Sequence, residues 1–232
     1  MIVATICTAA GWSWAVILIA FFVSATLLSR YRAAARDALF GDLVEKGGER
    51  DAWQVAANGG VYSLAAIAFV LYPSQAWLLA AVGSIAASTA DTWATEIGTL
   101  AARSPRLITT GRPVPVGTSG GVSWPGSLAG LAGAAFTAVV ALLTGWGGAA
   151  AAAAITGGVA GMLVDSVAGA SIQRRGWCQT CGKATERLVH RCGSITETRG
   201  GIDWVNNDAV NAISSVAGAA VGSIFWYLPS RL

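Results

Sequence analysis

Four carboxylates lie within or at the edge of otherwise apolar segments, and they are the first candidates for chemistry in this sequence. Asp91 and Glu96 share one such segment, Asp165 lies in another, and Asp208 begins a third. An acidic side chain inside a membrane-spanning helix costs roughly 2.5–3.5 kcal/mol on insertion scales, so these residues are functional candidates by default. The alternative for each is pairing with an arginine or capping a helix end, and capping is a strong competitor at Asp208.

Asparagine side chains add neutral oxygens to this acidic set. Asn58 begins a further apolar segment, and Asn207 and Asn211 flank Asp208. Asp208 and Asn211 are three residues apart, so they share a helix face. Carboxylate and amide oxygens are hard ligands that suit Mg²⁺, an ion that proteins commonly share with substrate phosphates. We therefore expect a magnesium site where these helices converge.

The segment from Arg106 to Ser123 has the composition of an anion-binding loop. It contains two prolines that stiffen it, and it leads directly into an apolar helix, whose N-terminus favours negative charge. It lacks the Gly-Lys-Ser/Thr ending of a Walker A motif, and an ordinary tight turn is the alternative. The candidate phosphate ligands are the side chains of Arg106, Thr109, Thr110, Arg112, Thr118 and Ser119 and the backbone N–H groups of Gly117, Gly120 and Gly121.

A second cluster has the ligand types of a zinc site. Cys178 and Cys181 form a close pair, which is followed by His190 and Cys192. Three thiolates and one imidazole are a common structural zinc set, and a small loop without an apolar core gains stability from a metal. Reduced thiols without a metal are the alternative, because only one residue separates His190 from Cys192. The remaining cysteine, Cys7, is expected to pack among apolar side chains.

The elements that must position these residues are membrane helices. Mean hydropathy is +0.58, and apolar residues make up 54% of the 232 residues against 12% for charged ones. A spanning helix needs roughly 20 mostly apolar residues. The fold class is therefore all-α, a single polytopic membrane domain over residues 1–232 with about six transmembrane helices, and the first window is expected to be a span, not a secretory signal. The six windows are approximately residues 3–28, 52–72, 77–101, 122–144, 147–172 and 204–228.

Basic residues predict how these helices are oriented. Fourteen of the fifteen Lys and Arg residues follow the first, third and fifth windows, and Arg231 is the exception. Because basic residues near helix ends stay in the cytoplasm, we expect the loops 103–121 and 173–203 and the acidic residues to face the cytoplasm, with both termini outside. This topology accounts for the net charge of +3 without a nucleic-acid partner. Tryptophans fit the same interfaces, Trp53, Trp124 and Trp204 on one side and Trp77, Trp146 and Trp226 on the other.

Small residues at four-residue spacing predict close helix packing. Such pairs let helix backbones approach one another in lipid. Related Gly-Gly-Val phrases follow Asn58, Ser119 and Thr156, which fits a diverged 3+3 duplication. The glycine pairs are Gly126 and Gly130, Gly157 and Gly161, and Gly218 and Gly222.

These motifs together resemble an integral-membrane family, the phytyl-phosphate kinases of the vitamin E salvage route and the relatives of transmembrane protein nineteen. The resemblance covers nearly the whole chain, and its blocks occur in the family's order. The blocks are Ala57-Asn58-Gly59-Gly60-Val61, Ala90-Asp91-Thr92-Trp93-Ala94-Thr95-Glu96-Ile97-Gly98, Arg106-Leu107-Ile108-Thr109-Thr110, Gly117-Thr118-Ser119-Gly120-Gly121-Val122-Ser123, Asp165-Ser166, Cys178-x-x-Cys181 and Asn207-Asp208-x-x-Asn211.

The resemblance implies phosphoryl transfer from ATP or CTP to an isoprenyl monophosphate in the membrane. On this interpretation Asp91, Glu96, Asp165 and Asp208 hold Mg²⁺ or orient phosphates, with Asn58, Asn207 and Asn211 as supporting ligands. Arg106, Arg112 and the backbone from Gly117 to Gly121 neutralise the phosphoryl groups.

Two other functions fit the same residues. A cytidylyltransferase acting on a lipid phosphate would need the same metal and phosphate ligands, and it would release pyrophosphate instead of a nucleoside diphosphate. A transporter would also use intramembrane carboxylates and glycine-rich helices, but its site would lie near mid-membrane. The nucleotide, the tail length and the oligomeric state, a homo-oligomer included, stay open.

Overall fold

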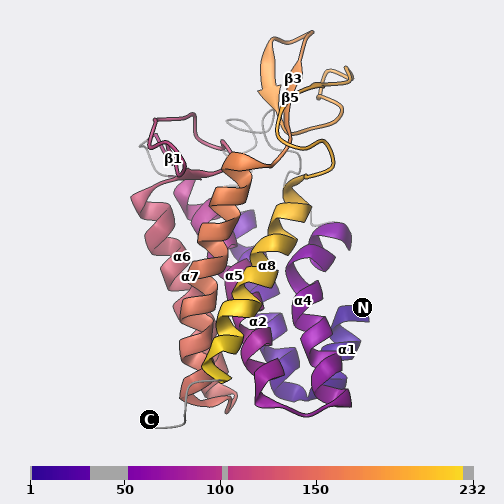
Figure 1. Cartoon of the computed structure of the whole chain (residues 1–232), viewed down its shortest axis with the longest axis vertical. Helices are drawn as coiled ribbons and strands as arrows, with labels where there is room; N and C mark the ends of the chain where they lie inside the picture. Colours follow the sequence, from indigo (N-terminus) through magenta and orange to yellow (C-terminus); the bar gives the residue numbers. More distant parts are fainter. Residues whose placement is uncertain (1, 32–51, 101–103, 227–232) are drawn as a thin grey trace.

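A computed structural model describes residues 2–31, 52–100 and 104–226 and shows a bundle of helices with small sheets at one end (Figure 1). The loops 104–123 and 172–206 contain all the described strands and lie at that end, which we call the loop end. The helices are α1 (Ile2–Ala10), α2 (Trp12–Arg30), α4 (Ala52–Leu71), α5 (Gln75–Gly98), α6 (Trp124–Leu143), α7 (Gly147–Ser171), α8 (Asn207–Ser223) and the 3₁₀ turn η1 (Ile224–Trp226). The strands are β1 (Arg106–Leu107), β2 (Gly121–Val122), β3 (Arg175–Cys178), β4 (Lys183–Thr185) and β5 (Glu197–Gly200).

The chain is an integral membrane protein by the length and apolar character of its helices. Five of the described helices are long and apolar enough to cross a membrane, namely α2, α4, α6, α7 and α8 extended through η1. The bounds of α4, α6, α7 and α8 with η1 follow the predicted windows to within a few residues, whereas α2 begins nine residues after the start of its window. The predicted count of six spans depends on α5, which has 24 residues but a lower hydropathy than the other five.

α5 has this lower hydropathy because it lies in the middle of the bundle. It contacts α2, α4, α6, α7 and α8, and all residues from Ala81 to Ala90 are buried. A helix surrounded by protein needs few lipid-facing side chains, so it can carry hydroxyl groups that bond to its own backbone. Ser84, for example, donates to the carbonyl of Ala81 at 2.7 Å. The residue run that contains Asp91 therefore lies on the central helix.

The predicted glycine pairs pack against α5, which explains their spacing. A Cβ atom placed on Gly157 would lie 2.8 Å from Cα of Gly83, and one on Gly126 would lie 3.0 Å from the carbonyl oxygen of Ala94. Gly222 of α8 likewise faces the carbonyl of Leu79, where an added Cβ would lie at 2.5 Å. Small residues on α6, α7 and α8 thus let three helices approach one central helix closely.

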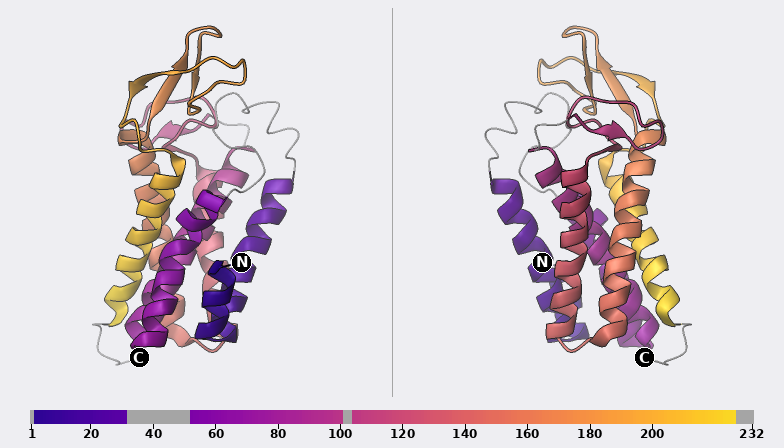
Figure 2. Two further views of the ribbon diagram at one scale, coloured as in Figure 1. Left: turned by 90° about the vertical axis from the view of Figure 1, so that its right-hand side faces the viewer. Right: turned by 90° about the vertical axis from the view of Figure 1, so that its left-hand side faces the viewer.

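The first predicted span is wrong as a single helix over residues 3–28. Gly11, at a φ of 136°, separates α1 from α2, and only α2 is long enough to cross a membrane. α1 has nine residues, about 13 Å of helix at 1.5 Å per residue. It packs against α2 and α4, and it starts part-way along the bundle in both views of Figure 2.

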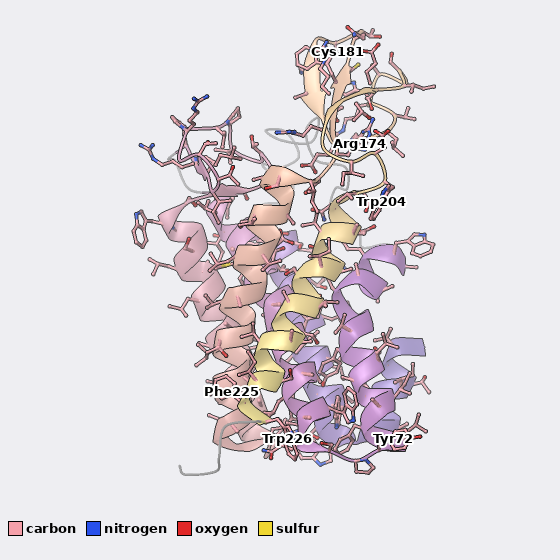
Figure 3. The ribbon with its side chains drawn as sticks, viewed as in Figure 1. Tyr72, Arg174, Cys181, Trp204, Phe225 and Trp226 are labelled. Atoms are coloured by element: carbon pink, nitrogen blue, oxygen red, sulfur yellow. The ribbon has the colours of Figure 1, made fainter. Side chains whose placement is uncertain are left out.

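Aromatic residues mark both ends of the bundle, with one exception to the prediction. Trp204 lies at the loop end and Trp226 at the opposite end, both largely exposed (Figure 3). Trp146, by contrast, is 8% exposed and packs edge-on against Trp14, with ring centroids 4.8 Å apart. Trp146 therefore belongs to the core, which also buries Cys7 as predicted, and not to an interfacial belt.

Candidate functional site

Asp91 of α5 and Asp165 of α7 form a pair of carboxyl groups inside the bundle. The two groups lie within hydrogen-bonding reach of each other. Each residue is two turns from the loop end of its helix, about 10 Å at 1.5 Å per residue. Oδ1 of Asp165 is buried and receives no hydrogen bond from the described residues. Because two adjacent carboxylates repel each other when ionised, a cation between them would stabilise the pair.

The loop between α5 and α6 covers this end of α7. β1 and β2 pair in antiparallel fashion and bring the segment before β2 back over the bundle. Gly120 adopts a φ of +75°, and a Cβ there would lie only 2.6 Å from the carbonyl oxygen of Ser166 and from the backbone nitrogen of Ala170. Only glycine allows this contact. The turn at Ser119 and Gly120 therefore lies directly on the helical turn that follows Asp165.

Glu186 is a third carboxylate near the pair, and the sequence analysis did not single it out. It directly follows β4, and its Oε1 accepts a short hydrogen bond from the hydroxyl of Ser119. Its charge acts on Asp165, so the two lie close enough to interact electrostatically. Glu186 comes from a polar loop, where an acidic residue is ordinary, so its sequence position carried no signal. The candidate site thus joins α5, α7 and both loops.

The structure does not bring the four predicted carboxylates into one cluster. Within the described segments, the group of three or more His, Cys, Asp or Glu side chains that could hold a metal ion is the Cys/His group of the second loop, which contains no carboxylate. Glu96 faces α2, where the hydroxyl of Ser29 donates to its Oε1 at 2.7 Å. Asp208 lies in the first turn of α8, but Asn206 is the N-cap and accepts from the backbone nitrogen of Ala209 at 3.0 Å. Asp208 is therefore not the N-cap residue, although its position in the first turn places its charge near the helix N-terminus.

The backbone at Asn58, one of the predicted asparagines, takes part in buried hydrogen bonds about one turn below Asp91, while its side-chain amide donates to the carbonyl of Gln54 at 3.0 Å. Asn58 is buried in α4, and its carbonyl oxygen accepts a hydrogen bond from Ser88 of α5 at 3.0 Å. Ser88 in turn bonds to Ser215 of α8 at 3.1 Å. Asn211 is buried one turn earlier in α8, and Asn207 is the first residue of that helix. These hydrogen bonds join three helices behind the acidic pair.

Only part of the predicted phosphate loop lies at the acidic pair. Ser119 and Gly120 lie at the pair. Arg106 and Arg112 are exposed on the rim of the loop, where Arg106 donates to the carbonyl of Gly111 at 2.8 Å. Gly117, with a φ of 87°, and Gly121 in β2 shape the hairpin. The hydroxyl of Thr118 donates to the carbonyl of Pro115 at 2.8 Å. The predicted phosphate ligands whose side chains are exposed are Arg106, Thr109, Thr110 and Arg112.

The Cys/His residues converge in the second loop, above the ends of α7 and α8. The ligand atoms of Cys178, Cys181, His190 and Cys192 all lie within 4.8 Å of one another, and all three thiols are free. Hydrogen bonding with Ser194 and then His190 lowers the pKa of Cys192 to about 6. A hydrogen bond with Cys192 raises the pKa of Cys181 to about 11. Figure 3 shows Cys181 at the outer tip of this loop.

The sequence was compared with known families and proteins. The model of a family described as integral membrane protein DUF92 matches residues 1–219. Protein PGR of Arabidopsis thaliana is 30% identical over 96% of this chain and 85% of its own length. An uncharacterized membrane protein of Methanocaldococcus jannaschii is 30% identical over 93% and 77%. Protein VTE6, chloroplastic, of Arabidopsis thaliana is 30% identical over 72% of this chain and 42% of its own length. No solved structure matches.

Proposed function

Since the chain belongs to the DUF92 family of integral membrane proteins, we propose that it is a lipid-phosphate kinase that converts an isoprenyl monophosphate to the diphosphate. The observation that carries this proposal is the Asp91–Asp165 pair beneath the turn at Ser119 and Gly120. The resemblance to phytyl-phosphate kinases supports the choice of substrate class.

The acidic pair has the donor chemistry of a magnesium site. Asp91 and Asp165 supply adjacent carboxylates, one of them with a buried oxygen that no described group donates to, and Glu186 supplies a further carboxylate nearby. Magnesium commonly binds one or two carboxylates and shares its remaining positions with phosphates and water. When bound, Mg²⁺ would neutralise charge on the phosphates of the two substrates.

The residues around the pair bind and orient the two phosphates. The loop from Thr118 to Gly121 adjoins the start of α6. The N–H groups of Thr118 and Gly121 donate to the carbonyls of Pro115 and Thr118, so the backbone N–H groups proposed to meet phosphate oxygens are those of Ser119 and Gly120. Arg106 and Arg112 lie on the rim, where a nucleotide would arrive from water, and their guanidinium groups suit bidentate phosphate contacts. The apolar tail of the lipid would stay between helices, so its phosphate would reach the site from the bundle side.

The reaction itself needs positioning more than acid–base chemistry. An oxygen of the lipid monophosphate attacks the γ-phosphorus of the nucleotide, the bond from that phosphorus to the β–γ bridging oxygen breaks, and a nucleoside diphosphate leaves. The attacking phosphate oxygen is already ionised at neutral pH, so no general base is required. Catalysis then depends on alignment of the two phosphates and on neutralisation of their charge.

The test is a product analysis with purified protein. The protein is incubated with Mg²⁺, with ATP or CTP, and with phytyl, farnesyl or geranylgeranyl monophosphate, and the lipids are identified by mass spectrometry. We expect a lipid diphosphate and a nucleoside diphosphate. A nucleotidyl lipid with pyrophosphate would instead identify a cytidylyltransferase, and no lipid product with any pair of substrates would contradict both.

A further inference from the structure

We propose that Cys178, Cys181, His190 and Cys192 bind a structural zinc ion that fixes the loop carrying Glu186. The four residues are the one group of three or more His, Cys, Asp or Glu side chains within the described ranges whose ligand atoms converge within 4.8 Å. The zinc site itself does not depend on the proposed reaction. Only the importance of Glu186 for activity rests on the proposed function.

The distances within the cluster fit tetrahedral zinc. With Zn–S near 2.3 Å and Zn–N near 2.0 Å, tetrahedral geometry places sulfur atoms about 3.8 Å apart and nitrogen about 3.5 Å from sulfur. The Sγ atoms of Cys178 and Cys192 are 3.6 Å apart, and Nδ1 of His190 lies 3.2 Å from Sγ of Cys192. The cluster therefore needs only small adjustments to close around an ion.

The two halves of the cluster have matching turns. Gly182 follows Cys181 at a φ of 62° and donates its N–H to the carbonyl of Cys178 at 2.9 Å. Gly193 follows Cys192 at a φ of 85° and donates to the carbonyl of His190 at 2.8 Å. Each turn thus presents two ligands and closes with a left-handed glycine, a conformation that other residues adopt with strain. The backbone preforms both halves of the site.

The surroundings of His190 also favour a ligand role. Its side chain is buried, yet Nε2 makes no hydrogen bond within the part of the chain that the structure describes. Within the described residues, Nδ1 contacts the thiol and the backbone nitrogen of Cys192, at 3.2 Å and 3.4 Å. Nδ1 faces the other ligand atoms of the cluster, so a zinc ion would bind this nitrogen and hold the ring in place. The neutral imidazole would then carry its proton on Nε2.

A zinc ion at this position would fix Glu186 from both sides. Cys181 and Gly182 lead directly into β4, Glu186 follows β4, and His190 comes four residues later. The segment between the two halves of the cluster is thus short and held at both ends. Because the hydroxyl of Ser119 donates to Glu186, the zinc loop also meets the loop that covers α7.

The experiment measures metal in the full-length protein purified in detergent from cells supplied with zinc. We expect about one zinc per chain for a single four-ligand site. Cys181→Ser and His190→Ala should each lose it, whereas Cys7→Ala, which removes a thiol in the bundle, should retain it. Thr180→Ala changes a neighbour that is not a ligand and should also retain it. Zinc kept in both ligand variants, or iron found in place of zinc, would overturn the proposal.

A second measurement covers the case in which the ligand variants do not fold. Chelator-treated wild-type protein is titrated with Co²⁺, and we expect the visible absorption of tetrahedral cobalt–thiolate to saturate at about one equivalent. Absence of this absorption would show that the loop binds no metal. A count of fewer than four free thiols after denaturation without reductant would show a disulfide, and either result would overturn the proposal. Glu186→Gln should keep its zinc, and limited proteolysis of the loop should accelerate on chelation. If no lipid product is ever found, these metal readouts still decide the zinc site.

Discussion

At the scale of single residues, Asp91 is the most sensitive test of the acidic pair. Replacing Asp91 by Asn keeps the shape of the side chain but removes a charge beside Asp165. If the pair holds the ion that neutralises phosphate charge, the rate of lipid diphosphate formation should fall by roughly 10²–10³-fold, the usual loss for a group that stabilises developing charge. Because removing one of two repelling carboxylates does not harm packing, the melting temperature should stay the same or rise.

The control for Asp91→Asn is Asp203→Asn. Asp203 is exposed in the second loop and is not a member of the proposed site. Its replacement should leave the rate of product formation unchanged in the mass-spectrometric assay. Full activity in Asp91→Asn would remove Asp91 from the proposed metal site.

Replacing Glu186 tests whether activity depends on the proposed site or only on the charge of the second loop. Glu186→Gln removes the acceptor charge that Ser119 bonds to, and the rate should fall by roughly 10–100-fold, as for groups that orient ligands. Glu197→Gln is the matched change in β5, where Glu197 bonds to Gln179 on the exposed side of the sheet. The assay should show a loss only for Glu186→Gln, and equal losses in both variants would point to general surface charge.

The thiols of the second loop should differ in reactivity once metal is removed. Thiolates react with iodoacetamide, and thiols do so poorly. With a pKa lowered to about 6, Cys192 should be mostly thiolate at pH 7, and its modification rate should rise as pH increases through 6 and then level. With a pKa raised to about 11, Cys181 should react slowly at pH 7 and faster only in strong base. Peptide mass spectrometry measures both rates, and faster modification of Cys181 at pH 7 would contradict this order.

At the scale of helices, the packing around α5 depends on glycines. Gly157→Ala would place a Cβ 2.7 Å from the carbonyl oxygen of Gly218 and 2.8 Å from Cα of Gly83, both backbone atoms that cannot rotate away. Overpacking of this kind costs roughly 1–3 kcal/mol. The melting temperature in detergent should therefore fall.

Gly60→Ala is the matched control in α4. No atom lies within 4 Å of a Cβ placed on Gly60, and alanine is favoured over glycine in a helix by up to about 1 kcal/mol. The melting temperature should stay level or rise. A fall of equal size in both variants would show that the effect is not close packing against α5.

Hydropathy predicted most helices because lipid selects for long apolar runs, but it could not predict breaks within them. Residues 2–10 and 12–30 are both apolar, so the turn at Gly11 leaves the hydropathy unchanged. The same limit applies to the site. Asp91 and Asp165 were predictable because a carboxylate inside an apolar run is unusual, whereas Glu186 is placed by β-strands and turns in a polar loop, where no such contrast exists.

At the scale of the whole molecule, the polar groups that could do chemistry share one end of the bundle. Asp91, Asp165 and Glu186 lie toward the loop end, and both loops that meet there contain the described arginines outside the helices. The connections at the opposite end, residues 72–74 and 144–146, contain no charged residue. Since positive charge near helix ends is retained in the cytoplasm, we predict that the loop end faces the cytoplasm.

Cysteine labelling of intact cells tests this orientation. Cys181 and Cys192 are exposed at the loop end, and Cys7 is buried, so the native thiols report on one side only. A membrane-impermeant maleimide should label them only after the cells are permeabilised. Gln75→Cys places a thiol on an exposed residue at the opposite end and should be labelled in intact cells. If bound zinc protects the native thiols, the permeabilised sample needs a chelator first. Labelling of Cys181 in intact cells would reverse the predicted topology and place the rim proposed to bind the nucleotide outside.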